Sequence, residues 1–181
     1  MNTKELLQKI PDCWEQITLE QFQKIIQIQI TDNDDELDGV QNTLSILSVL
    51  VNITVDELEQ LPMKDIIQMG SKLSFTTSTP EPNTKVNMKF KNIDSLSYND
   101  YIVFIQIQDN YLTNLHQIIK TLSIKKLTDE QVLQMSIVDV MGGFFLLKKQ
   151  LKRYLNRSIR STIVLITKQK VKKVFKRITK I

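Results

Sequence analysis

Residues 10–22 read IPDCWEQITLEQF, and this stretch decides the fold class. Thr18 is followed three residues later by Gln21, the spacing of a capping box, in which two side chains satisfy free backbone N–H groups of the first helical turn. Apolar residues then recur at helical spacing, at Leu19, Phe22, Ile25, Ile26 and Ile30. Trp14 is the only tryptophan, and its place just before a capped helix predicts that it is a buried structural anchor.

The same helix signals recur along the chain. Apolar positions between Val40 and Val51 predict a second helix. Thr54 and Thr128 each precede a Glu or Gln by three residues, which predicts two short capped helices. Further helices are predicted from Pro62 to about Ser71, from a cap at Ser97 onward, and from Ser136 onward, where Gly142-Gly143 would weaken the helix locally.

The middle of the chain has a different period. Leu73, Phe75 and Thr77 alternate with hydroxyl residues, and Val86, Met88 and Phe90 alternate with polar ones. Alternation at period two is typical of strands, and a Pro-containing linker at 78–83 separates the two runs. We therefore expect a mainly α fold with a small β-hairpin near residues 72–91.

Charge divides the chain into two parts. From residue 140 to 181 there are 13 Lys or Arg and no Asp or Glu, which leaves 11 Lys or Arg against 20 Asp or Glu in residues 1–139, a net charge of −9. This asymmetry predicts an acidic, mainly helical body at 1–139 and a basic, amphipathic, helical C-terminal arm at 140–181. Met1–Pro11 is too polar for a signal peptide, and no apolar run is long enough to span a bilayer.

The basic arm is the candidate partner-binding region. Apolar residues at Leu147, Leu151 and Leu155 share one helical face with Ile159 and Ile163. The arm fits three roles: a helix packed on its own body or on a neighbour, a contact with nucleic-acid phosphates, or a membrane-surface helix. The candidate binding residues are Lys148, Lys149, Lys152, Arg153, Arg157, Arg160, Lys172, Lys173, Lys176 and Arg177.

Residues suited to catalysis or metal binding are few. His116 and Cys13 are the only residues of their kinds, so they cannot supply a zinc cluster, and Cys13 has no evident histidine partner. The acidic run at 32–38 lacks the Gly and Glu of a calcium loop, because those two positions hold Leu37 and Thr43. We therefore expect a protein that is not an enzyme, with no catalytic, cofactor-binding or metal-binding residues and no small-molecule substrate.

The two halves of the chain share a pattern. Residues 18–22 align without gaps on residues 97–101, and the sequence Ile-Gln-Ile-Gln occurs at both 26–29 and 105–108. Each half then contains a Thr-capped short helix, at Thr54 and at Thr128. The pattern indicates an internal repeat, and the alternative is chance similarity between helices rich in Ile and Gln.

Residues 10–22, together with Leu58–Leu61 and Leu73–Phe75, resemble small proteins of tailed bacteriophages, notably the crAss-like phages and other phages of Bacteroides-type hosts. The similarity covers about residues 10–110. It implies a virion component at the head–tail junction, a ring or adaptor subunit, or alternatively a tail-assembly chaperone. It also implies assembly in the host cytoplasm, other virion proteins and further copies of the chain as partners, and no cofactor. DNA contact through the basic arm is the competing function, and membrane binding is the least favoured.

Overall fold

The structure is a computed structural model that describes residues 3–30, 36–92, 96–100, 102, 111–154 and 156. The predicted mainly helical class is confirmed for these residues. The helices are α1 Thr3–Lys9, η1 Trp14–Gln16, α2 Leu19–Ile30, α3 Glu36–Val51, α4 Val55–Glu59, α5 Met63–Ser71, η2 Lys72–Thr77, α7 Tyr111–Leu122 and α8 Asp129–Leu133. Helical turns also cover 98–100, and a long helix covers 137–154.

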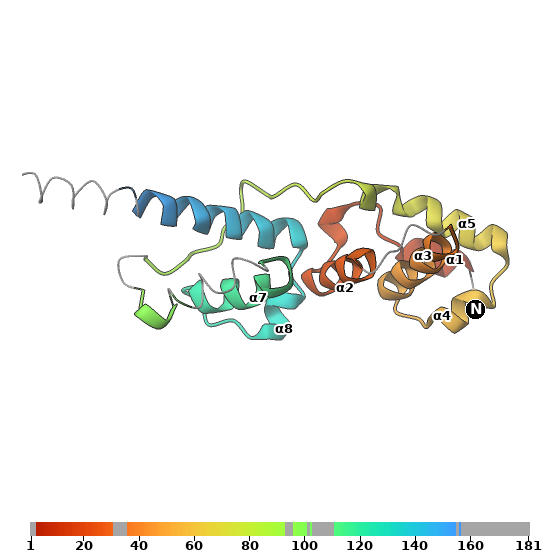
Figure 1. Cartoon of the computed structure of the whole chain (residues 1–181), viewed down its shortest axis with the longest axis horizontal. Coiled ribbons are helices and arrows are strands. Elements are labelled where there is room, and N and C mark those ends of the chain that lie inside the picture. The colour runs from red at the N-terminus through yellow and green to blue at the C-terminus, as the bar shows by residue number, and fades with distance from the viewer. Residues whose placement is uncertain are drawn as a thin grey trace, which may run out of the picture.

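The molecule is elongated (Figure 1). Helices α1, α3, α4 and α5 form one end, and α7, α8 and the 137–154 helix form the other. Helix α2 lies between them, because it packs against α3 on one side and contacts α7 and α8 on the other. Buried side chains from both ends form a single hydrophobic cluster, so α2 joins the two ends through the core. None of the described helices is long and apolar enough to cross a membrane.

Three capping boxes begin helices where the sequence predicts them. Thr18 Oγ1 accepts from the Gln21 N–H at 3.2 Å, and Thr54 Oγ1 accepts from the Glu57 N–H at 3.3 Å. Thr128 does the same for Gln131 at 3.2 Å. Each cap satisfies N–H groups that have no carbonyl partner within the helix, which fixes where α2, α4 and α8 begin.

Trp14 anchors the segment before α2, as predicted. Its side chain is 7% exposed, and its indole Nε1 donates to the Ser78 carbonyl at 2.9 Å. The ring makes edge-on contacts with Phe22 and Phe75, with centroid separations of 5.7 and 5.2 Å. The indole therefore joins the start of α2 to the end of η2, residues far apart in the sequence.

The predicted β-hairpin is wrong. Residues 72–77 form the 3-10 helix η2, and the run at 86–90 is extended but pairs elsewhere, through an isolated bridge between Phe90 and Ser123. The hydroxyls of η2 explain the difference, because Thr76 Oγ1 donates to the Leu73 carbonyl at 2.7 Å and Thr77 Oγ1 to the Ser74 carbonyl at 2.8 Å. Such bonds to the carbonyl three residues back favour helical turns over a ladder.

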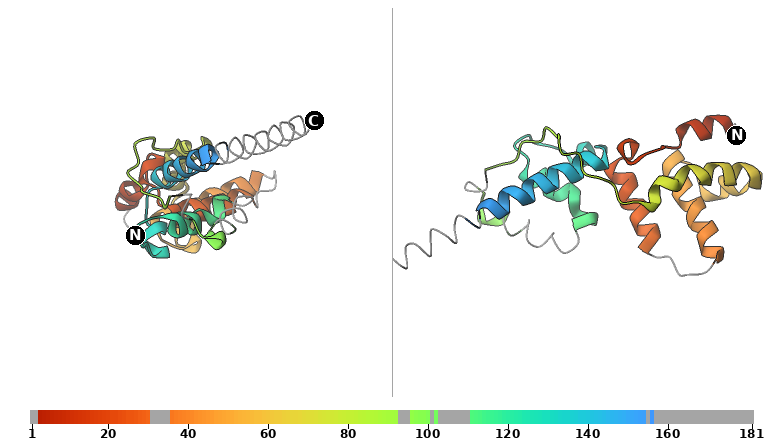
Figure 2. Two further views of the ribbon diagram at one scale, coloured as in Figure 1. Left: turned by 90° about the vertical axis from the view of Figure 1, so that its left-hand side faces the viewer. Right: turned by 90° about the horizontal axis from the view of Figure 1, so that it is seen from above.

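The 137–154 helix crosses the expected boundary at residue 140. Phe144, Leu147 and Leu151 are buried in the hydrophobic cluster, so the first part of the basic arm packs on the body. The helix runs without interruption through Gly142-Gly143. A Cβ at position 142 would collide with the backbone oxygen of Asn83, and one at 143 would collide with the Met88 sulfur. The two glycines therefore form a notch in which the extended segment 83–90 lies beside the helix (Figure 2).

The two halves repeat the same order of elements. A helix (α3 or α7) is followed by a short capped helix (α4 or α8) and then by a longer helix (α5 or 137–154). Residues 54–73 align without gaps on 128–147, at a constant offset of 74 positions from Thr54 to Thr128. Part of the core matches along this alignment: Leu58 and Val132, Ile66 and Val140, and Leu73 and Leu147 are all buried, whereas Met63 and Ile67 are exposed at positions where the second half has buried residues. Matching burial favours the internal repeat over chance similarity.

Candidate protein-binding surface

Polar side chains of the described residues serve mainly local structure. The side chains that the described residues bury are all hydrophobic. Thr54 is the clearest example of the polar role, because its backbone N–H and its hydroxyl both donate to the Glu57 carboxylate, at 2.9 and 3.0 Å. These bonds, led by the one from the backbone, hold the pKa of Glu57 below its ordinary value. The carboxylate caps a helix and faces solvent rather than a cleft.

Cys13 and His116 do not form a catalytic pair in the structure. Cys13 is half-buried, and the hydrogen bond between its side chain and Glu15, followed by desolvation, raises the pKa of the thiol. A raised pKa disfavours the thiolate that a nucleophile requires. His116 lies on α7, where its Nδ1 is 3.4 Å from the Gln23 amide nitrogen. Cys13 therefore interacts with Glu15 of its own segment, and His116 lies beside Gln23 of α2.

The acidic run at 32–38, which the sequence suggests is a loop, lies mostly outside the described residues. Glu36 and Asp38 fall within α3, and nothing is described of residues 31–35. Among the residues that the structure does describe, there is no group of His, Cys, Asp or Glu that could hold a metal ion.

The structure places four of the ten predicted binding residues together. Lys148, Lys149, Lys152 and Arg153 are exposed on the last two described turns of the 137–154 helix, opposite the buried Leu147 and Leu151. No ion pair involves these four within the described part of the chain. We call this group the basic end. The other six predicted residues, Arg157, Arg160, Lys172, Lys173, Lys176 and Arg177, lie outside the described residues.

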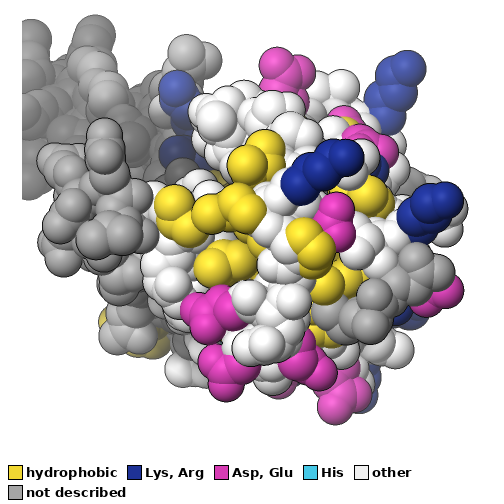
Figure 3. Space-filling model, turned by 90° about the vertical axis from the view of Figure 1, so that its right-hand side faces the viewer, with side chains coloured by type: hydrophobic (Ala, Val, Ile, Leu, Met, Phe, Trp, Pro, Cys, Tyr) yellow, Lys and Arg dark blue, Asp and Glu magenta, His cyan; other side chains and the backbone are white. Residues whose placement is uncertain are grey.

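A second surface was not singled out from the sequence. Met63 and Ile67, one helical turn apart on α5, are 64% and 65% exposed. On the adjoining face of the same helix, Ile66 and Met69 are buried and hold it to the core. We call Met63 and Ile67 the apolar end face. Hydrophobic side chains gather at this end of the molecule, with acidic side chains along one edge (Figure 3). The sequence holds one sign of this exposed surface, the adjacent pair Ile66-Ile67. Two neighbouring residues of a helix cannot both lie on the narrow apolar stripe that packs on the core, so one of the two is left exposed.

Helix α5 is held firmly behind this face. The Thr3 hydroxyl donates to the Asp65 carboxylate at 2.9 Å, and Lys72 at the end of the helix pairs with Asp12 at 2.9 Å. The hydroxyl of Ser71 bonds the Gln68 carbonyl at 2.7 Å, which reinforces the last turn. The two apolar side chains therefore project from an element with a fixed position, which lowers the entropic cost of binding a partner.

A polar groove of about 510 Å³ lies where the linker 81–85 meets the start of the 137–154 helix. Its wall includes Asn83, whose side-chain amide donates to Asp139 at 2.7 Å and whose backbone N–H donates to the Val138 carbonyl at 2.9 Å. Asn83 Oδ1 also accepts from the Lys85 N–H at 2.9 Å. These contacts join the linker to the helix, so Asn83 and Asp139 have a structural role.

Comparison with known proteins adds no assignment, because the sequence matches no family model, no curated protein and no solved structure.

Proposed function

We propose that this chain is a non-enzymatic structural or assembly protein that works by binding other protein surfaces. The observation that carries the proposal is the apolar end face. Met63 and Ile67 expose most of their side chains on a helix that is fixed by Ile66, Met69 and two polar contacts. Large apolar side chains that are paired and exposed on a rigid element are typical of binding sites for other proteins.

The proposed biological setting is the head–tail junction of a tailed bacteriophage, where the chain would act as a ring or adaptor subunit. Its support is the resemblance of residues 10–110 described above, and the elongated helical shape suits a subunit that must contact neighbours at both ends (Figure 1). A tail-assembly chaperone is the alternative within the same setting. A ring subunit would self-associate without a client, whereas a chaperone would stay monomeric and bind another chain.

The experiment is light scattering coupled to size-exclusion chromatography, over a concentration series of the full chain. The proposal predicts a mass that rises with concentration. It also predicts that Met63→Glu with Ile67→Glu lowers that mass, because each charge would be desolvated in a contact. Ile124→Glu is the matched control, since Ile124 is 62% exposed but lies outside α5. A mass that rises equally in all three proteins would show that the apolar end face is not used.

Contact with DNA is a second candidate function, and the basic end supports it. Lys148 and Lys152, like Lys149 and Arg153, are four residues apart, so the four cations form one exposed patch. If all four contact phosphates, the slope of log affinity against log salt would be about −3 to −4. Replacing the four by Gln should remove most of that slope.

A further inference from the structure

The internal repeat gives the apolar end face an equivalent inside the same molecule. At the offset of 74 positions, Met63 corresponds to Ile137 and Ile67 corresponds to Met141. The surrounding residues support this register, because Thr54 and Thr128, Gln60 and Gln134, Asp65 and Asp139, and Leu73 and Leu147 are identical pairs. The two surfaces can therefore be compared position by position.

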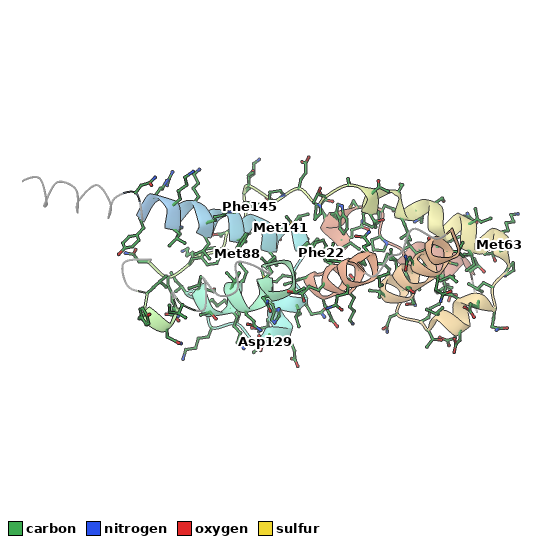
Figure 4. The ribbon with its side chains drawn as sticks, in the orientation of Figure 1. Phe22, Met63, Met88, Asp129, Met141 and Phe145 are labelled. Atoms are coloured by element: carbon green, nitrogen blue, oxygen red, sulfur yellow. The ribbon has the colours of Figure 1, made fainter. Side chains whose placement is uncertain are left out.

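In the second half, the chain covers this surface itself. Ile137 is fully buried and Met141 is 7% exposed. The cover is the start of α2: the Leu19 N–H donates to the Met135 carbonyl at 2.8 Å, and the Ile137 N–H donates to the Ile17 carbonyl at 2.9 Å. These two bonds form the antiparallel bridge between Thr18 and Ser136. Figure 4 shows Phe22 and Met141 on the facing elements.

In the first half, the equivalent surface is bare. The positions that correspond to Met135 and Ile137 are Leu61 and Met63. Within the part of the chain that the structure describes, no backbone hydrogen bond reaches the Leu61 carbonyl or the Met63 N–H. Pro62 occupies the position of Ser136, and the bridge tolerates proline there because it uses only the N–H and carbonyl of the flanking residues.

The covering segment also has an equivalent in the chain. The repeat aligns Ile17-Thr18-Leu19 with Leu96-Ser97-Tyr98. Ser97 caps its helix as Thr18 does, since its Oγ accepts from the Asp100 N–H at 3.0 Å. Tyr98 is 81% exposed, and among the described residues no backbone hydrogen bond reaches the Tyr98 N–H or the Leu96 carbonyl. This segment lies at the end of the molecule opposite to α5, so it cannot reach Met63 of its own chain (Figure 1).

We propose that Leu96–Tyr98 of one copy covers the apolar end face of a second copy. The contact would repeat the one that Ile17–Leu19 makes with Met135–Ile137 inside each chain. The Tyr98 N–H would donate to the neighbour's Leu61 carbonyl, and the neighbour's Met63 N–H to the Leu96 carbonyl. Because the two surfaces differ and lie at opposite ends, copies join head to tail and build a ring or a filament. The inference rests on the proposed assembly function and names the surface that serves it.

The test uses two full-length variants that each lose one half of the contact. Met63→Glu places a charge in the apolar end face but keeps Tyr98, and Tyr98→Glu places a charge in the covering segment but keeps Met63. Both positions are exposed, so both variants are expected to fold. Each variant alone should remain monomeric, and an equimolar mixture should form dimers that grow no further, with twice the monomer mass. A symmetric contact through Met63 alone would give no such recovery on mixing.

A disulfide provides the second measurement, in a Cys13→Ser background. Thr18 and Ser136 face each other directly in the bridge, so Pro62→Cys in one chain should face Ser97→Cys in another. Contact raises the local thiol concentration to about millimolar, and the cross-linked pair should form on the order of tenfold faster than a control pair of Ser97→Cys with Ile124→Cys. Thr18→Cys with Ser136→Cys in one chain provides the internal positive control.

The possible outcomes separate this inference from the proposed function. Recovery of dimers on mixing, with selective cross-linking, supports the head-to-tail contact. If the wild type self-associates but mixing and cross-linking match the controls, the contact is overturned while assembly through another surface stands. If the wild type stays monomeric at every concentration and neither test responds, both the contact and the self-assembling ring are overturned.

Discussion

Gly142→Ala should destabilise the protein, although alanine is the better helix former. The added methyl would collide with the Asn83 carbonyl oxygen, and it would lie 3.0 Å from the Asn83 carbonyl carbon and 3.3 Å from its nitrogen. These are backbone atoms, so the linker must move. That movement strains the two hydrogen bonds that Asn83 makes to Val138 and Asp139, at 2.9 and 2.7 Å.

The expected size follows from three terms. Helix propensity favours alanine over glycine by about 1 kcal/mol. Overpacking against the backbone costs about 1–3 kcal/mol, and weakening two hydrogen bonds costs about 1 kcal/mol each. The net loss is about 2–4 kcal/mol, which for a chain of this size lowers Tm by roughly 4–16 °C.

Gly39→Ala is the matched control for this prediction. Gly39 lies within α3, and a Cβ there would meet no atom within 4 Å. Only the propensity term remains, so this variant should gain about 0.5–1 kcal/mol. Gly143→Ala should cost less than Gly142→Ala, because the closest atom at that position is the flexible Met88 sulfur.

The assay is thermal and urea unfolding followed by circular dichroism at the helical band, with all three variants beside the wild type. A Gly142→Ala protein as stable as Gly39→Ala would refute the reasoning. It would mean that segment 83–90 does not lie in the glycine notch.

Three further predictions concern single interactions. Trp14→Phe keeps a ring in the core but loses the hydrogen bond from Nε1 to the Ser78 carbonyl, so it should lower the free energy of unfolding in urea by about 1–2 kcal/mol. Trp14→Ala should lower it by about 3–5 kcal/mol. A Trp14→Phe protein as stable as the wild type would mean that the indole N–H contributes nothing. Glu57 has a lowered pKa, so its contribution to stability is complete at neutral pH and is lost as the pH falls through the pKa of the folded state. Glu57→Gln should therefore flatten the acid side of the pH–stability profile. Gln131→Glu, in the equivalent cap of α8, should steepen it. Asn52 follows α3 with φ of 56°, so Asn52→Gly should raise Tm slightly, whereas Asn52→Ala should lower it.

The sequence by itself determined three helix starts and the buried anchor, whereas α1 and the start of α3 at Glu36 were not predicted. Thr18 with Gln21, Thr54 with Glu57, and Thr128 with Gln131 form their caps as the spacing predicts. A capping box depends on residues three positions apart, so its geometry does not require contacts with distant parts of the chain. Trp14 was predictable for a similar reason, because a large apolar ring beside a capped helix has few alternatives to burial.

Only the tertiary structure decided what the middle of the chain does. The alternation at 73–77 and 86–90 resembles two strands, yet a strand requires a partner at matching register, and the hydroxyls of Thr76 and Thr77 instead bond carbonyls of their own turn. The notch at Gly142 was equally hidden, since glycine in a helix looks like a weak point until the segment that packs against it is known. The exposed Met63 and the buried Ile137 make the same point. They are equivalent in the repeat and alike in chemistry, and they differ in exposure because the start of α2 can reach only one of them.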